Sequence, residues 1–172
     1  MNRFLLPLSL LLAVLLLLLA QCTWGYRWSL GGVHVELLPP LLFYAAFTVS
    51  LPTALLLALL AATMYDSFSG GYFGASMLPY VLSTALFCGI RPIFFRNRIS
   101  TQFFSGFVFG FIALFLQWTL CGKFIVGIAH VVPKITCLAL LMGILAVIYF
   151  AVLDLFCSLM GVIPRRGEEP FA

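Results

Sequence analysis

The sequence predicts an all-α integral membrane protein with six transmembrane helices, or five if two short apolar runs join. Two observations support this fold class. First, 64% of the 172 residues are hydrophobic and only 8% are charged, whereas about a quarter of the residues of a soluble domain are charged. Second, the apolar runs are long and do not alternate with polar residues, which favours helices over a membrane barrel.

Six apolar runs supply the expected spans, at residues 4–23, 37–49, 53–65, 75–95, 103–121 and 135–160. The first run rises about 30 Å as a helix, enough to cross the hydrocarbon layer. A cleaved signal peptide is the alternative for this run, with Arg3 as its positive start and a cut near Ala20. Trp24, Tyr26 and Trp28 follow it, as expected of an aromatic belt at the membrane surface.

The second and third runs are separated by Ser50, Leu51 and Pro52. Joined into one kinked helix, residues 37–65 would extend about 43 Å, which is long for a bilayer even when the helix is tilted. We therefore expect two short helices. One kinked helix is the alternative, and it gives five spans.

The fourth run leads into the densest positive cluster of the chain, Arg91, Arg96 and Arg98. Cytoplasmic loops of membrane proteins carry an excess of positive residues. We expect this cluster and the C-terminus on the cytoplasmic side of the membrane, and the N-terminus there too if there are six spans. The cluster is interpreted as a topological anchor, with a docking surface for a cytoplasmic partner as the alternative.

The last two runs carry a packing motif and a charge. Gly106 and Gly110 have the GxxxG spacing that lets membrane helices approach closely, inside one chain or between subunits. Asp154 shares a helix face with Gly143, so we expect it to be a buried polar residue that points into the protein. Acids at membrane depth are costly and suggest function. An ion pair with Arg91, a neutral hydrogen-bonded acid and a transport role all stay open.

Residues 54–74, ALLLALLAATMYDSFSGGYFG, carry the most specific pattern. Ala54, Ala58 and Ala62 recur every four residues and therefore lie on one helix face, and Asp66 continues the series. The segment predicts a helix with a small-residue packing stripe that ends in an acid.

A turn with Gly70 and Gly74 follows this helix. Asp66 either orders the turn by accepting hydrogen bonds from its backbone N–H groups or contacts a partner. We expect the turn on the outer side of the membrane. A role for Asp66 as catalytic acid or base is not expected, because no second titratable group accompanies it.

An apolar helix that ends in Asp66, a glycine turn that reaches Gly74 and a further apolar helix that runs to Arg91 together resemble the rod shape-determining protein MreD family. The family pattern, G-x-L-x-D followed by seven residues and a glycine, is met by Asp66 and Gly74, while Ala62 stands where glycine is more usual. Asp154 matches no feature of the family. The resemblance implies a bacterial inner-membrane protein of the cell-wall elongation complex that maintains rod shape and has no chemistry of its own.

The resemblance also implies partners and a fold. The partners are MreC and, through MreC, the peptidoglycan polymerase, the transpeptidase and MreB. The fold would be similar to that of the substrate-binding subunits of ECF vitamin transporters, so a subunit that binds a vitamin-like small molecule is the alternative function. The residues expected to bind a partner are Ala58, Ala62, Asp66, Gly70, Gly74, Arg91, Arg96 and Arg98.

Several other classes of function are not supported. The net charge of +4 is small and scattered, so nucleic acid is not an expected partner. The five cysteines form no metal-ligand spacing, and His34 and His130 lack nearby acids, so we expect no metal site. A disulfide between Cys22 and Cys121 stays open. Catalytic and nucleotide-binding motifs are missing, and we expect a single membrane domain over 1–172 that is neither an enzyme nor dependent on a cofactor.

Overall fold

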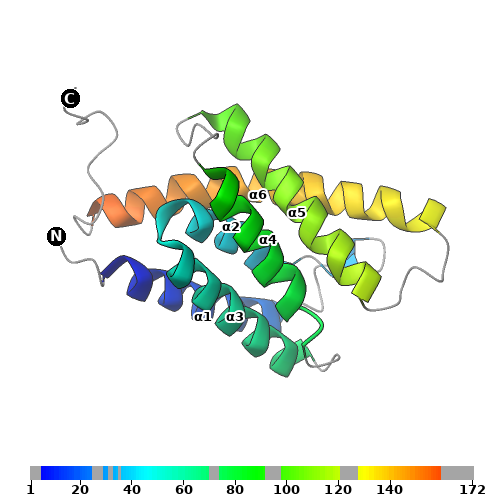
Figure 1. Ribbon diagram of the computed structural model, residues 1–172, viewed down its shortest axis with the longest axis horizontal. Helices are drawn as coiled ribbons and strands as arrows, with labels where there is room; N and C mark the ends of the chain where they lie inside the picture. The colour runs from blue at the N-terminus through cyan, green and yellow to red at the C-terminus, as the bar shows by residue number, and fades with distance from the viewer. Residues whose placement is uncertain are drawn as a thin grey trace.

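The computed structural model describes residues 5–24, 29–30, 33–34, 36–69, 74–91, 98–120 and 128–159. These residues are helical apart from one short ladder (Figure 1). The helices are α1 (Leu5–Trp24), α2 (Leu38–Thr48), α3 (Leu51–Ser69), α4 (Met77–Ile90), α5 (Ile99–Leu120) and α6 (Ile128–Leu159). The ladder pairs β1 (Ser29–Leu30) antiparallel with β2 (Val33–His34). The prediction of an all-α chain is confirmed for this part of the sequence, and only the ladder was not foreseen.

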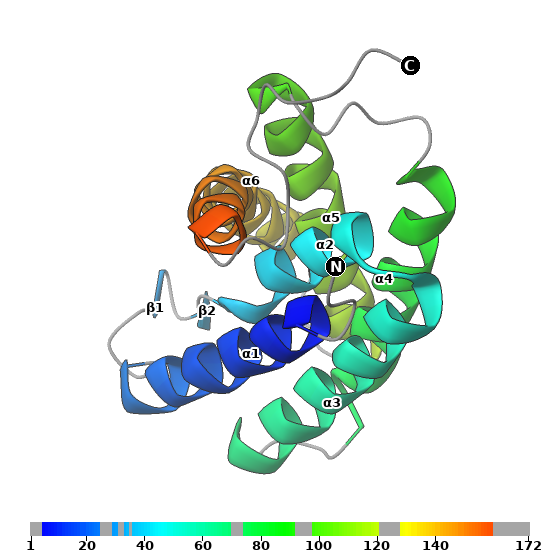
Figure 2. The ribbon, with the colours of Figure 1, turned by 90° about the vertical axis from the view of Figure 1, so that its left-hand side faces the viewer.

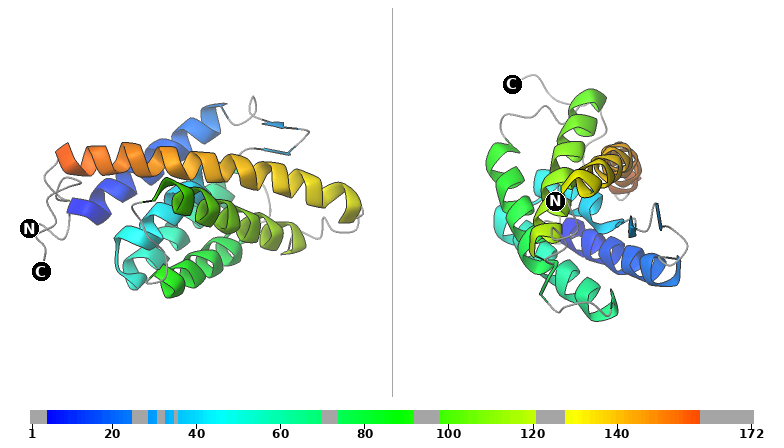
Figure 3. Two further views of the ribbon diagram at one scale, coloured as in Figure 1. Left: turned by 90° about the horizontal axis from the view of Figure 1, so that it is seen from above. Right: turned by 90° about the vertical axis from the view of Figure 1, so that its right-hand side faces the viewer.

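Three helices contain segments long and apolar enough to cross a membrane, Leu51–Phe68, Ile99–Leu120 and Val131–Ser158. The apolar segments Pro7–Gln21, Leu38–Thr48 and Met77–Ile90 are shorter. By length and composition, these helices indicate a membrane protein. Figure 3 shows α6 as the long helix that runs along the whole bundle.

The second and third runs form two helices, not one kinked helix. The backbone at Val49 is extended, with φ −111° and ψ 172°, so the helical path is interrupted between Thr48 and Leu51. Pro52 lies in the first turn of α3, where a missing N–H is tolerated because it has no partner inside the helix. Figures 2 and 3 show that α3 turns back alongside α2.

Several helix boundaries differ from the prediction; α5, for example, begins at Ile99 and not at residue 103. α3 continues to Ser69, so Asp66 lies within its last turn and does not end the helix. α6 begins at Ile128 and runs through Pro133, whereas the sequence suggested a loop up to residue 134. Pro133 is the sixth residue of α6, so the helix lacks one backbone hydrogen bond there but continues through it.

α2 lies at the centre of the bundle and contacts all five other helices that the structure describes (Figure 2). Every residue from Leu38 to Phe47 is buried, so protein surrounds this helix on all sides. Its eleven residues rise only about 16 Å, roughly half the thickness of the hydrocarbon layer.

The two ends of α2 are capped by other helices. Backbone groups at helix ends have no partner within the helix, and leaving them unpaired away from water is costly. Leu37 N donates to Oε1 of Gln21 in α1 at 3.3 Å, and Pro39 and Pro40 in the first turn of α2 bring no N–H that needs a partner. At the other end, Nη1 of Arg91, just after α4, donates to Val49 O at 3.0 Å.

Aromatic rings pack around α2. The ring of Phe43 contacts those of Phe47, Phe87, Phe109 and Phe150, with centroids 5.0 to 5.7 Å apart. Such edge-to-face and tilted pairs add to the stabilisation from burial. Because these rings come from α2, α4, α5 and α6, the cluster ties distant parts of the chain together.

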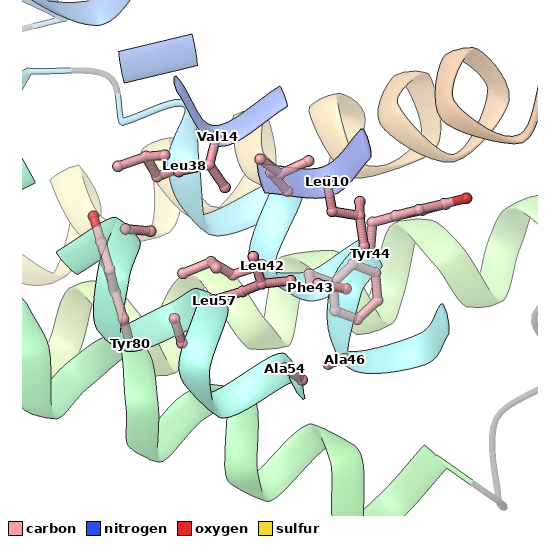
Figure 4. Packing of buried hydrophobic residues seen from close by; sticks show 14 of the residues in the cluster. Leu10, Val14, Leu38, Leu42, Phe43, Tyr44, Ala46, Ala54, Leu57 and Tyr80 are labelled. Carbon is pink, nitrogen blue, oxygen red and sulfur yellow. The ribbon is translucent and has the colours of Figure 1, made fainter. Parts of the chain in front are cut away.

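α1 completes the same core. Leu10, Val14 and Leu18 lie on one face of α1 and are at most 2% exposed, and Figure 4 shows the first two above the residues of α2. The first helix is therefore packed as part of the bundle, as expected if it is a transmembrane span.

The GxxxG pair of α5 packs against α6 within the chain. A Cβ atom on Gly106 would lie 2.5 Å from Cβ of Ala146, and one on Gly110 would lie 2.7 Å from Cβ of Met142. Both distances are shorter than real contacts between carbon atoms. Of the two interpretations of this motif, packing inside one chain is the one observed.

We expect Gly106→Ala to destabilise the bundle by about 1–3 kcal/mol, because the added methyl group overlaps Ala146 in a packed interface. Gly89→Ala is the matched control, since a Cβ there meets nothing within 4 Å. Thermal unfolding in detergent measures both variants. Adding Ala146→Gly to Gly106→Ala should restore part of the loss, and an unchanged midpoint in Gly106→Ala would contradict the close packing.

Candidate functional site

Polar side chains gather at two opposite ends of the bundle. At one end, the starts of α2 and α4 meet the ends of α1, α3 and α5, and hydrogen bonds join them. We call it the Asp66 end. At the other end, the last residues of α2 meet those of α4, and we call it the Arg91 end.

Asp66 holds the turn that follows α3. Its side chain is only 4% exposed, and Oδ2 accepts hydrogen bonds from Gly74 N at 2.8 Å and Ser76 N at 3.2 Å. Gly74 has φ +93°, a conformation that glycine adopts without the steric penalty of a Cβ. Asp66 therefore orders the turn, which was one of its two predicted roles, and any effect on a partner acts through the turn.

Glu36 is the main residue that the sequence did not reveal. It lies just before α2, is 6% exposed, and accepts three hydrogen bonds. The Tyr80 hydroxyl donates to Oε2 at 2.6 Å, while the Tyr65 hydroxyl and Nε2 of Gln117 donate to Oε1 at 3.3 and 3.0 Å. A carboxylate that leaves water needs such donors, and these three come from α3, α4 and α5.

The two acids of the Asp66 end belong to one network. Nε2 of Gln117 lies 3.0 Å from Glu36 Oε1 and 3.4 Å from Ser76 Oγ. The backbone N–H of the same serine binds Asp66. The other amide atom, Gln117 Oε1, is buried and meets no hydrogen-bond donor among the described residues. We call Glu36, Tyr65, Asp66, Ser76, Tyr80 and Gln117 the outer network.

The alanine stripe is not a contact surface for a partner. Ala54, Ala58 and Ala62 are fully buried, on a helix that contacts α4, α2 and α1. The prediction that Ala58 and Ala62 bind a partner directly is therefore wrong. The stripe does allow close helix packing, as predicted, but the helices that it contacts belong to the same chain.

The arginines and the remaining predicted groups are placed only in part. Arg91 and Arg98 are exposed, and Arg91 also caps α2, a role beyond topological anchoring. Gly70, Arg96 and the side chains of Cys22, Cys121, His34 and His130 lie outside the described residues.

Asp154 lies towards the end of α6 and is half-buried, not fully buried as predicted. Its Oδ1 accepts a hydrogen bond from the hydroxyl of Tyr44 at 2.8 Å. Tyr44 is fully buried in α2, so this bond anchors α6 to the central helix. The guanidinium of Arg91, proposed above as a counter-charge, donates to the Val49 carbonyl.

The outer network is suited to holding a surface in shape. Both oxygens of Glu36 and Oδ2 of Asp66 accept hydrogen bonds from the protein itself. Within the described residues, no group of three or more His, Cys, Asp or Glu is placed to hold a metal ion. The signals for this network in the sequence are slight: Tyr65 directly precedes Asp66, and Tyr80 lies one helical turn after Ser76.

Comparisons with protein-family models, curated proteins and solved structures find no match for the chain. We therefore base the functional proposal on the residues and geometry of the Asp66 end.

We expect Gly74→Ala to lower stability by about 1–2 kcal/mol, because a Cβ at positive φ strains the backbone. A Cβ at Gly74 meets nothing within 4 Å, and neither does one at Gly89. Gly89→Ala is thus a control that adds the same methyl group within helix α4, at a negative φ, where alanine is favoured over glycine. Unfolding of the two variants in detergent should separate them, and equal midpoints would show that the turn tolerates a side chain.

Proposed function

We propose that the chain is a non-enzymatic scaffold or regulatory subunit of the bacterial cell-wall elongation complex in the inner membrane. In this role it binds MreC and, through MreC, couples to the peptidoglycan polymerase, the transpeptidase and MreB to maintain rod shape. The proposal rests on the resemblance to the MreD family and on the geometry of the residues that carry the resemblance.

The observation that supports it most is the bond between Asp66 and Gly74. These are the two residues that meet the family pattern, and they are joined at 2.8 Å, with the glycine at positive φ. The spacing between them is therefore the one that this turn requires. An aspartate that accepts the N–H and a glycine that adopts φ +93° give the pattern a physical reason.

In the proposed arrangement the bundle has six spans, with both termini in the cytoplasm. The Arg91 end is cytoplasmic and the Asp66 end is outside. Positive charges support this orientation, because the inner side would hold Arg3, Arg91, Arg96, Arg98, Arg165 and Arg166, and the outer side Arg27, Lys123 and Lys134. The short α2 fits as a span because protein surrounds it on all sides.

The outer turn is the proposed contact for the external domain of MreC, and the apolar helix faces would contact its transmembrane segment. Large apolar side chains are exposed along α1 and α6, where lipid or another membrane helix covers them. The buried Asp66 acts in this proposal by fixing the shape of the turn.

The alternative function, a small-molecule-binding subunit of a transporter similar in fold to the ECF subunits, has one observation in its favour. Glu36, Tyr80 and Gln117 converge at the same end, as polar groups in ligand pockets do. A vitamin-like molecule that stays bound to the purified chain would favour this alternative over the scaffold.

Depletion of the protein should turn rod-shaped cells into spheres, and the detergent-solubilised chain should co-purify with MreC.

We expect Asp66→Ala to reduce MreC capture several-fold, because the turn loses two hydrogen bonds that are each worth about 1 kcal/mol. Quantitative co-purification at matched expression measures the effect.

Two controls accompany this experiment. Asp154→Ala removes an acid at the opposite end, and Gly106→Ala lowers stability without touching the outer network. Neither should reduce capture to the level of Asp66→Ala. Full capture by folded Asp66→Ala would overturn the proposed role of the turn.

A further inference from the structure

We propose that Glu36 and Gln117 are positioning residues for the Asp66 turn, so that the shape of the outer surface is set from the start of α2 and the end of α5. The part of this inference that concerns a partner rests on the proposed function. The part that concerns the turn stands on geometry alone.

The first step is the contact path. Asp66 Oδ2 holds the N–H groups of Gly74 and Ser76. Gln117 Nε2 lies 3.4 Å from the hydroxyl oxygen of that serine and 3.0 Å from Glu36 Oε1. Ser76 is 1% exposed, so water offers little replacement for the amide. Asp66 from α3 and Gln117 from α5 therefore both hold the segment from Gly74 to Ser76, just before α4.

The second step is the orientation of Gln117. A carboxylate only accepts hydrogen bonds, so Glu36 fixes which end of the amide faces it: the NH₂ group points to Glu36 and Ser76, and Oε1 points away. Flipping the amide would place oxygen against oxygen. Glu36 therefore determines that Gln117 presents a donor to the turn.

The third step is the anchoring of Glu36 itself. The hydroxyls of Tyr65 and Tyr80 hold its two oxygens. Tyr65 directly precedes Asp66 in α3, and Tyr80 lies one helical turn after Ser76 in α4. The path therefore closes on itself: each side of the turn is connected to Glu36 by a tyrosine, and the serine side also by Gln117.

The chain provides a matched control for this network. Tyr44 and Tyr80 are both fully buried, and each donates one hydrogen bond to a carboxylate, at 2.8 Å to Asp154 and at 2.6 Å to Glu36. Tyr44→Phe and Tyr80→Phe thus remove the same chemical group from opposite ends of the bundle. A general loss of stability affects both variants, whereas a loss of positioning affects only the second.

The test that does not depend on a partner is amide hydrogen exchange in detergent at Gly74 and Ser76. Glu36→Gln replaces one carboxylate oxygen by an NH₂ donor at constant size, and Gln117→Met removes the amide at similar length. We expect exchange at these two amides to become about tenfold faster in both variants and in Tyr80→Phe, as for the loss of one hydrogen bond. Tyr44→Phe should leave it unchanged.

Unchanged exchange in the first three variants, or an equal rise in Tyr44→Phe, would overturn the positioning role. If Glu36→Gln does not fold, Gln117→Met and Tyr80→Phe decide the question, because they retain the carboxylate.

Capture of MreC by the same variants separates this inference from the proposed function. We expect Gln117→Met to reduce capture, and Asp66→Ala with Gln117→Met to be no worse than Asp66→Ala alone, because both act on one turn. Faster exchange with full capture in every variant, Asp66→Ala included, would leave the positioning role standing and overturn the proposed function. Lost capture in Asp66→Ala with unchanged exchange in Gln117→Met would support the proposed function and overturn the positioning role.

Discussion

Burial of α2 is the constraint on which the rest of the structure depends. A helix of eleven residues that is enclosed by protein cannot leave its terminal N–H and C=O groups to water, and each unpaired group is costly in an apolar medium. The protein meets this requirement with Gln21 at one end and Arg91 at the other. These caps come from α1 and from the end of α4. The terminal backbone groups of α2 therefore restrict where those two helices can lie.

The two ends of the bundle treat their acids differently. At the Asp66 end, two carboxylates are almost completely enclosed and share a network that reaches four helical elements. At the opposite end, Asp154 is half-buried and has Tyr44 as a neutral donor. The phenylalanine rings around Phe43 lie between these two ends, in the core that surrounds α2. Buried, hydrogen-bonded acids are thus concentrated where the proposed partner surface lies, which suits a scaffold.

Local patterns in the sequence predicted the features that depend on neighbouring residues. The low charge predicted a membrane protein. Pro52 predicted the break between α2 and α3, and Asp66 followed by Gly74 predicted the turn. Glu36 was missed because its partners lie 29, 44 and 81 residues further along the chain. The alanine stripe was predicted to contact a partner because small residues indicate close packing without showing which helix packs against them. The central position of α2 could not be predicted either, because its sequence is apolar all round and gives no polar face from which to judge its orientation.

The long reach of the contacts around α2 affects how the protein is made. Tyr44 and its acceptor Asp154 are 110 residues apart in the sequence. Phe43 likewise contacts Phe150, which lies in the last helix. A nascent chain therefore contains α2 well before the ribosome has synthesised α6, one of the helices that enclose it. Until translation is nearly complete, α2 lacks the contacts with α6 that help to bury it in the finished protein.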